Sequence, residues 1–460
     1  MFVICFQWVA KVRIIFAHPI KTEITDLKTF TLILLSIFAM SICTLAQDED
    51  DYFSDSQLRY ENYIYKENIK SVLLENNNEK LSYPFIALNS EEVVRLDFDD
   101  LDGGYKNYTY GVVQCNADWT PSNLSTAQYI SGFWENPLNS YAYSLNTIQT
   151  YTHYACVVPN ENTKITKSGN YLLMVYEDFD KENIVLTRRF VVYENLVGID
   201  AHVKKATILS DSRYRHEIDF SINTKGFKID NAFTDVKIAI TQNGRWDNAC
   251  SGLQPLFVQD NLLIYDYEDK NTFMAGNEFR HFDFRSIRFL SDRIQNLETE
   301  YNGYSVYLFP DERRSSLRYQ SMADINGQYY ISMQEANDDD IEPDYARIFF
   351  RLKSDKVSQA GSLYVFGALS DWQCKPEFKM TYNTEEKQYE TNAFLKQGWY
   401  DYEYVFLPQN DSLAIADESI IEGTHTLAGQ NYTLFIYHRE AGQYYDRVIA
   451  AKSLNSLRDF

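Results

Sequence analysis

Side chains that could carry out catalysis are scattered along this chain rather than gathered in the spacings that known reactions require. Its seven histidines form no HExxH pair and its cysteines form no CxxC, so metalloprotease and zinc patterns are missing. The GxSxG, P-loop and dinucleotide glycine patterns are missing too. Residues 324–327 resemble the start of a calcium loop but lack its glutamate, which favours a turn. The sequence predicts a protein that is not an enzyme, with no catalytic residues, cofactor or metal; a hydrolase with two paired carboxylates is the alternative.

The stretch from residue 110 to residue 160 is rich in Asn, Tyr, Ser and Trp. Specific protein interfaces often use aromatic anchors, so we interpret this stretch as a surface that fits a partner. The alternative is that these side chains fold back and brace the first domain. The candidate partner-binding residues are Asn116, Asp118, Trp119, Tyr129, Phe133, Trp134, Tyr151 and Tyr154.

A period-two alternation of apolar and polar residues predicts that β-strands position these groups. The alternation is clearest in four runs, at residues 94–98, 218–222, 236–240 and 348–352. Each run has one apolar and one polar face, which is typical of antiparallel sheets. Asn-Gly pairs at 243–244 and 326–327 suit tight hairpin turns. Only residues 286–301 have the apolar spacing of a helix.

These patterns predict an all-β fold of two to three immunoglobulin-like antiparallel β-sandwich domains in tandem, with few helices. Polar joints near residues 194–199 and 354–360 separate the domains. The predicted parts are a signal peptide at 1–46, an N-terminal β-sandwich domain at 47–195, a middle β-rich domain at 196–355 and a C-terminal domain at 356–460. An aromatic content of 15% argues against disorder and supplies large cores.

The N-terminal residues have the pattern of a secretory signal peptide. Lys28 precedes an apolar run at 30–40, and small residues follow at 44–46. A preceding segment as long as 1–26 is unusual, so synthesis is expected to begin near Leu27. Cys43 follows an isoleucine rather than a small residue, which argues against a direct lipid anchor. A single anchoring helix is the alternative, although the apolar run is short for a membrane span.

The charge content narrows the classes of partner, and the cysteine content raises the question of a disulfide. Removal of residues 1–46 takes away four basic and two acidic residues, leaving 39 Lys and Arg against 63 Asp and Glu, a net charge of −24. Such a surface repels nucleic acid and anionic lipid. The acidic tract at 338–344 is interpreted as a solvated loop. In an exported chain Cys115 and Cys156 form a possible disulfide, and the alternative is that both are buried free thiols.

Two segments near the C-terminus, at 363–372 and 395–404, resemble early-set immunoglobulin-like modules related to glycogen-binding domains. They carry a strand-glycine-turn-Trp element and a late hairpin with a Gly-x-Tyr-x-Tyr pattern. The resemblance implies that Trp372 and Trp399 stack on sugar rings, which makes an exported carbohydrate-binding protein the alternative function. The structural alternative is that both rings are core and hairpin aromatics.

A longer series of short motifs resembles the plug protein family of the type IX secretion system of Bacteroidota. The motifs appear in order over residues 60–455, with Gln114 as a departure where the resemblance leads us to expect His. They lie at 114–119, 129–133, 143–147, 151–154, 168–171, 241–248, 275–280 and 396–400. The resemblance implies a periplasmic protein at the inner face of the outer membrane. It would bind the large outer-membrane translocon β-barrel and close its periplasmic mouth when no cargo is passing.

Overall fold

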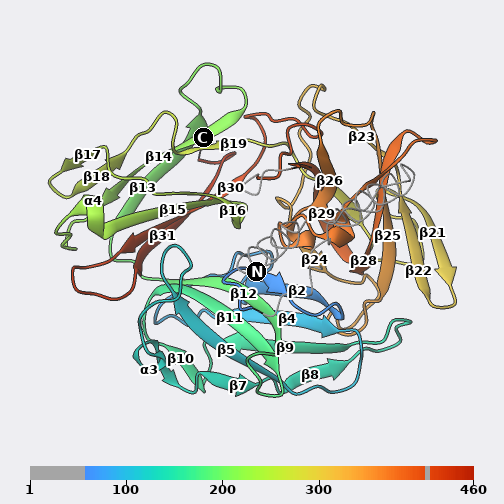
Figure 1. Ribbon diagram of the computed structural model, residues 1–460, viewed down its shortest axis with the longest axis horizontal. Coiled ribbons are helices and arrows are strands. Elements are labelled where there is room, and N and C mark those ends of the chain that lie inside the picture. The colour runs from blue at the N-terminus through green and yellow to red at the C-terminus, as the bar shows by residue number, and fades with distance from the viewer. Residues whose placement is uncertain (1–56, 410–414, 460) are drawn as a thin grey trace, which may run out of the picture. The chain divides into compact units, whose positions relative to one another are not determined.

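Antiparallel β-strands build the protein in the computed structural model, which describes residues 57–409 and 415–459 (Figure 1). The helices in these segments are short: α3 (Thr126–Tyr129), α4 (Ala232–Asp235), η2 (Ala368–Ser370) and η3 (Pro376–Phe378). None of these described helices is long and apolar enough to cross a bilayer. The prediction of an all-β fold with few helices is confirmed. The predicted signal peptide at 1–46 and the expected start near Leu27 lie outside the described residues.

The first sandwich consists of two main sheets and a two-stranded ribbon. One sheet has the order β1 (Tyr63–Ile64), β12 (Ile184–Tyr193), β11 (Gly169–Glu177), β5 (Tyr108–Cys115) and β7 (Glu135–Pro137), with β3 (Phe85–Ala87) parallel to β12. The other has the order β2 (Ile69–Asn76), β4 (Val94–Asp100), β9 (Thr152–Val158) and β8 (Ser140–Tyr143), and β10 (Thr163–Ile165) pairs with β6 (Ile130–Gly132). The alternating Val94, Leu96 and Phe98 all point into the core between the main sheets. Each such buried side chain contributes about 1.5–3 kcal/mol to folding.

The second sandwich also has two sheets. The first contains β13 (Gly198–Lys205), β14 (Arg215–Asn223), β18 (Leu262–Tyr265) and β17 (Phe257–Gln259), with β19 (Thr272–Met274) beside β14. The second contains β16 (Arg245–Ser251), β15 (Val236–Gln242), β30 (Asn431–His438) and β31 (Arg447–Asn455). Asn243 and Gly244 join β15 to β16 with positive φ angles of 52° and 73°, so the predicted hairpin turn is confirmed.

The third sandwich lies between β19 and β30 in the sequence. One sheet contains β20 (Arg280–Asp283), β29 (Gly398–Pro408) and β24 (Tyr329–Ile331), with β26 (Gly361–Phe366) on β29. The other contains β21 (Ile294–Glu300), β22 (Gly303–Leu308), β25 (Tyr345–Lys353), β28 (Gln388–Lys396) and β27 (Thr381–Asn383), with β23 (Asp311–Glu312) on β25. Asn326 and Gly327 have positive φ as predicted, but the following β24 pairs with β29, so their turn is not a hairpin.

The third sandwich is inserted into the second rather than following it. Strands β30 and β31 lie in the range predicted for the C-terminal domain, yet β30 pairs with β15, placing Ile436 opposite Ile238 (Figure 1). Both residues belong to the core of the second sandwich. The boundary expected near residues 354–360 falls inside the third sandwich, between β25 and β26. Two strands that pair while almost 200 residues apart leave no local pattern in the sequence. Composition alone therefore misplaces this boundary.

The helix predicted at residues 286–301 is wrong, because residues 294–300 form strand β21. The register against β22 shifts between Ile294 and Asn296, so one extra residue is accommodated there. A β-bulge of this kind puts residues three apart on the same face of a strand. Ile294 and Leu297 therefore both pack toward the core at a spacing that imitates a helix.

Candidate functional site

The structure divides the eight candidate partner-binding residues into buried and exposed groups. Trp119, Tyr129, Tyr151 and Tyr154 are buried, whereas Phe133 is 68% exposed. Asp118 is also exposed, and Asn116 and Trp134 are intermediate. Buried side chains do not reach a partner in this conformation. The bracing alternative therefore describes the buried half of the set.

Trp119 braces the first sandwich against the second. Its ring lies edge-on to Trp246, with centroids 4.9 Å apart, and the Arg189 guanidinium covers it at 4.4 Å. Both tryptophans belong to an apolar cluster that includes Phe435 from β30. Asn116 adds a polar link, since its Oδ1 accepts a 2.6 Å hydrogen bond from Arg439.

Three of the other candidates make their contacts within the first sandwich. Tyr129 donates a hydrogen bond to the Val112 carbonyl oxygen at 3.3 Å. Tyr154 stacks on Phe98 in the core, with ring centroids 5.4 Å apart. Trp134 is covered by the Lys181 ammonium at 3.9 Å. These contacts show that Tyr129, Tyr154 and Trp134 pack within the first sandwich.

Tyr151 crosses to the third sandwich. Its hydroxyl donates to the carbonyl oxygen of Pro343 at 2.9 Å, and its ring lies edge-on to Tyr345. The ammonium of Lys396 sits 4.1 Å from the ring centroid, in a cation–π contact. Tyr151 is therefore held by three residues that are distant in the sequence.

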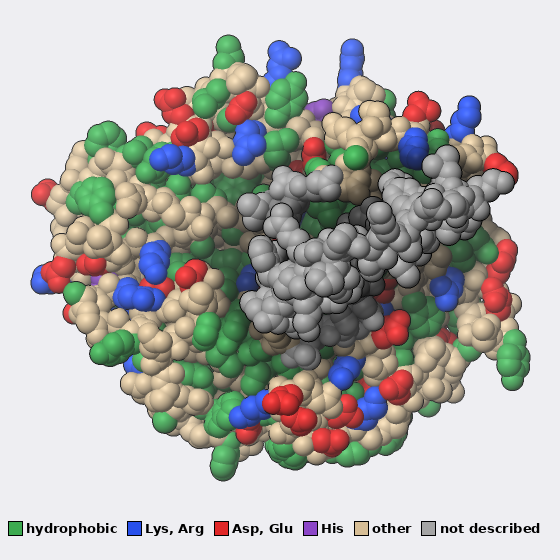
Figure 2. All heavy atoms as spheres, viewed as in Figure 1, with side chains coloured by type: hydrophobic (Ala, Val, Ile, Leu, Met, Phe, Trp, Pro, Cys, Tyr) green, Lys and Arg blue, Asp and Glu red, His purple; other side chains and the backbone are tan. Residues whose placement is uncertain are grey.

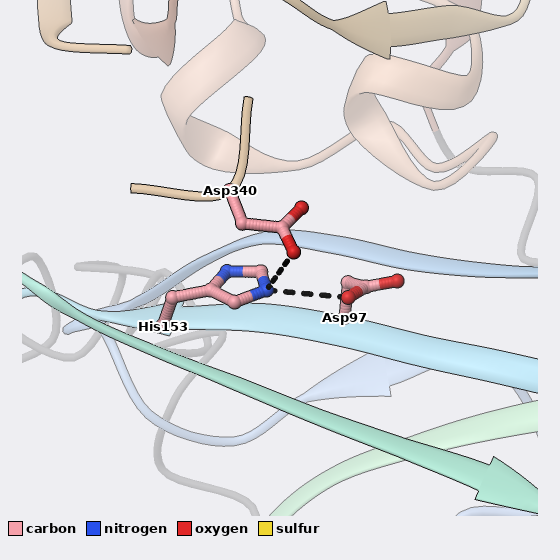
Figure 3. A group of neighbouring side chains, drawn as sticks. All are labelled: Asp97, His153 and Asp340. Carbon is pink, nitrogen blue, oxygen red and sulfur yellow. Dashed lines mark hydrogen bonds and ion pairs between the residues drawn. The ribbon is translucent and has the colours of Figure 1, made fainter. Parts of the chain in front are cut away.

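His153 lies on β9, two residues after Tyr151, among aspartates from two sandwiches (Figure 3). Its Nδ1 is 2.8 Å from Oδ1 of Asp99, and its Nε2 is 3.2 Å from Oδ1 of Asp97. Asp340 approaches the same ring nitrogen as Asp97, with its Oδ2 3.8 Å from Nε2. Arg95 joins the sandwiches as well, because its Nη2 donates to Asp340 at 2.9 Å.

Opposite charges balance in this group, which we call the charged junction. Its cations are Arg95, His153 and Lys396, and its carboxylates are those of Asp97, Asp99 and Asp340. Lys396, at the end of β28, approaches Asp99 to 2.7 Å although both side chains are almost completely buried. Removing one partner of a buried pair leaves an uncompensated charge and is strongly destabilising. The junction therefore clamps the first sandwich to the third.

The pKa values agree with this charge balance. Burial by itself would lower the pKa of His153, but hydrogen bonds with Asp97 and Asp99 raise it to about 9. Burial opposes ionisation of the two carboxyls, yet the pKa of each is held below its ordinary value by His153 and a neighbouring Arg95 or Lys396. At neutral pH the imidazole is therefore a cation.

Asp97, His153 and Asp340 have ligand atoms close enough together to hold a metal ion. A histidine ligand offers a neutral nitrogen to the metal, however, and both nitrogens of this imidazolium donate to carboxylates. A second acidic group, Glu217 with Asp219 and Asp266, surrounds the Lys204 ammonium. Both arrangements are explained by ion pairing with protein cations.

The acidic tract at 338–344 is not simply a solvated loop. Asp344 is 5% exposed, and its carboxylate accepts hydrogen bonds from the backbone N–H groups of Ile148 and Gln149 at 2.5 and 3.1 Å. Asp340 belongs to the charged junction. The sequence gives little indication that this tract is partly buried, because a run of acidic residues looks the same whether or not a second domain covers it.

The possible disulfide between Cys115 and Cys156 is not formed, and both residues are free thiols. Cys115 ends β5 and packs in the apolar cluster between the first and second sandwiches. Cys156 lies on β9, in the other sheet, and packs against the core of the first sandwich. Burial raises the pKa of the Cys115 thiol to about 12, which makes it a poor nucleophile.

The two tryptophans considered for sugar stacking have protein partners. The Trp372 ring contacts Phe366 and Phe279 edge-on, and the Arg245 guanidinium lies 5.1 Å from its centroid. Trp399 stacks on His281 with centroids 4.7 Å apart. These contacts favour the structural alternative for both residues.

An exposed tyrosine cluster on β8 lies outside the predicted set. Tyr141 and Tyr143 are 40% and 54% exposed, and Tyr105 lies 5.0 Å from Tyr141 between ring centroids. The available sequence signal is the order Ser-Tyr-Ala-Tyr at residues 140–143, which puts both tyrosines on one face of a short strand.

Acidic, basic and apolar side chains are intermixed on the face drawn in Figure 2. Charge of one sign does not gather over any large part of the described surface in that view. On this face the charge pattern therefore does not mark a partner-binding surface.

Known proteins match this chain in two ways, one within the first sandwich and one over most of its length. A family model described as "Type 9 secretion system plug protein 1st domain" matches residues 69–194, from the first residue of β2 to just past the end of β12. The chain is also similar to the crystal structure of a hypothetical protein from Parabacteroides merdae ATCC 43184. The sequence identity is 35%, the TM-score is 0.83, and the match covers 87% of this chain and 100% of that one. Among curated proteins no match was found.

Proposed function

Because this chain belongs to the plug protein family of the type IX secretion system, we propose that it seals the system's outer-membrane translocon. In this proposal the mature chain is exported and works in the periplasm, at the inner face of the outer membrane. It binds the periplasmic mouth of the large translocon β-barrel and closes it when no cargo is passing. It acts without catalysis, without nucleic acid and without a direct lipid anchor.

The observation that carries the proposal is the match of the plug first-domain model to residues 69–194, which hold the first sandwich except its strand β1. A seal also has to keep its shape under load, and the contacts between sandwiches are suited to that task. The charged junction ties the first sandwich to the third, and the Trp119 cluster ties the first to the second. Buried ion pairs and packed aromatic rings resist sliding because any displacement leaves charges or cavities uncompensated.

Affinity purification tests the partner. The tagged mature chain, recovered from gently solubilised membranes, is expected to bring down a barrel of very high mass. A tagged, unrelated periplasmic protein of similar size serves as the control. Recovery of the monomer without a barrel would contradict the proposal.

Outer-membrane permeability tests the sealing role. Deletion of the gene is expected to make the membrane leakier to a normally excluded dye or antibiotic, and to leave the folding of secreted cargo unaffected. The wild-type chain supplied in trans should restore the barrier. An unchanged permeability in the deletion strain would argue against a plug.

A further inference from the structure

Strand β8 is an open edge of the first sandwich. Its sheet has the order β2-β4-β9-β8, so among the described strands β8 has β9 as its one neighbour (Figure 1). Just beyond the strand, the backbone N–H of Ser144 donates a 2.9 Å hydrogen bond to the backbone carbonyl oxygen of Tyr151. Ser144 and Tyr151 thus form a hydrogen-bonded pair. In an antiparallel ladder such pairs alternate with pairs whose backbone N–H and C=O groups point away from the neighbouring strand, here β9. The N–H and C=O groups of Tyr141 and Tyr143 consequently point to the open edge.

The tyrosines on this edge are anchored in the core. Tyr141 lies directly opposite Tyr154 across the ladder, with ring centroids 5.9 Å apart, and Tyr154 stacks on buried Phe98. From Tyr141 the ring contacts continue outward to Tyr105 at 5.0 Å and Tyr143 at 5.8 Å. We call Tyr105, Tyr141 and Tyr143 the tyrosine edge. Aromatic rings held this way lose little conformational entropy on binding, which is a property of interface anchors.

Uncompensated acidic groups lie next to the tyrosine edge. Leu145, two residues after β8 and 49% exposed, donates its backbone N–H to Ile341 at 2.9 Å, which places the acidic tract alongside. The Asp338 and Glu342 side chains accept backbone hydrogen bonds within that tract. Neither forms an ion pair with a Lys or Arg in the described part of the chain. A partner that supplies basic side chains is electrostatically complementary to this region.

We infer that the tyrosine edge is the docking surface for an extended, basic segment of the translocon barrel, which adds to β8 as a further strand. This inference rests on the proposed plug function and specifies its contact surface. The partner's backbone pairs with Tyr141 and Tyr143, its apolar side chains pack on the tyrosine rings, and its Lys or Arg side chains face Asp338 and Glu342. Open sheet edges bind extended segments in this way through main-chain hydrogen bonds, with side chains providing specificity.

Photo-crosslinking locates the contact directly. The full mature chain carries p-benzoylphenylalanine at position 143 or, as a matched control, at position 257. Phe257 is 58% exposed on β17, which is also the edge strand of its sheet. The barrel is expected to crosslink at position 143 and not at position 257. Crosslinking at 257 alone, or at 143 only to lipid or to a second copy of the chain, would overturn the assignment.

Affinity measurements with the purified, detergent-solubilised barrel provide a second readout. Tyr143→Asp is expected to weaken binding by about tenfold or more, and Phe257→Asp to leave it unchanged. The double variant Asp338→Asn, Glu342→Gln keeps the backbone acceptors but removes both charges, so the salt dependence of binding should become shallower. Wild-type affinity in Tyr143→Asp would refute the surface while leaving the plug function standing. Failure of the wild-type chain to recover the barrel would refute both.

Discussion

Replacing His153 with glutamine should weaken the charged junction by an amount that depends on pH. Glutamine retains a hydrogen-bond donor but no titratable charge. In the wild type the protonated ring balances Asp97 and Asp99, whose pKa values are lowered, so both stay ionised at neutral and alkaline pH. The variant therefore keeps the carboxylates and loses one of the three cations that face them.

The size of the effect follows from the pKa of His153, which rises from 6.5 in the unfolded chain to about 9 in the folded protein. This rise corresponds to about 3 kcal/mol of stabilisation at most, counted once because the lowered carboxyl pKa values describe the same contacts. A raised folded-state pKa stabilises fully below the unfolded-state value and is lost as the pH rises through the folded-state value. The contribution is thus complete below pH 6.5 and gone above about pH 9.

Urea unfolding followed by tryptophan fluorescence at pH 6, 7.5 and 9.5 measures this effect. His153→Gln should be less stable than the wild type by about 3 kcal/mol at pH 6, and the difference should shrink toward zero by pH 9.5. His202→Gln is the matched control, because its side chain is 60% exposed and lies 3.8 Å from Asp219, outside the charged junction, so stability should change by no more than about 0.5 kcal/mol. A difference that is constant, or that grows with pH, would refute the reasoning.

Three further predictions concern packing and thiols. Trp119→Ala should lower the free energy of unfolding by about 3–5 kcal/mol because the ring fills the contact with Trp246, and a loss under about 1 kcal/mol would contradict this. Gly244→Ala puts a methyl group 2.5 Å from the Tyr83 ring at a φ of +73°, so the melting temperature should fall by about 2 °C or more; an unchanged value would show that the site tolerates a side chain. In denaturant without reductant, all four thiols of the described chain should react with a thiol reagent, whereas reaction of two would reveal a disulfide.

Features that depend on neighbours along the chain were predictable from the sequence. The alternation of Val94, Leu96 and Phe98 identified β4 because successive side chains in a strand point to opposite faces. The Asn243-Gly244 pair identified its hairpin because both residues adopt positive φ at little cost. The family was recognisable for the same reason, since its motifs are short and keep their order along the chain.

The extra residue in β21 shows where local reasoning fails. Ile294 and Leu297 share a face only because the strand bulges against β22, and the same spacing in isolation indicates a helix. The insertion of the third sandwich into the second is equally invisible, since it depends on β30 pairing with β15.

Tertiary structure alone decided which aromatic residues are exposed. Tyr141 and Tyr154 are the same residue type in neighbouring strands and face each other across one ladder, yet Tyr154 is buried and Tyr141 is 40% exposed. The sequence by itself determined the alternating strands, the aromatic content and the ordered motifs of the family. The position of β8 at the edge of its sheet decided which tyrosines remain exposed, and the approach of Asp340 decided that His153 joins two sandwiches. Both depend on contacts between distant residues, and such contacts leave no periodic signal in the sequence.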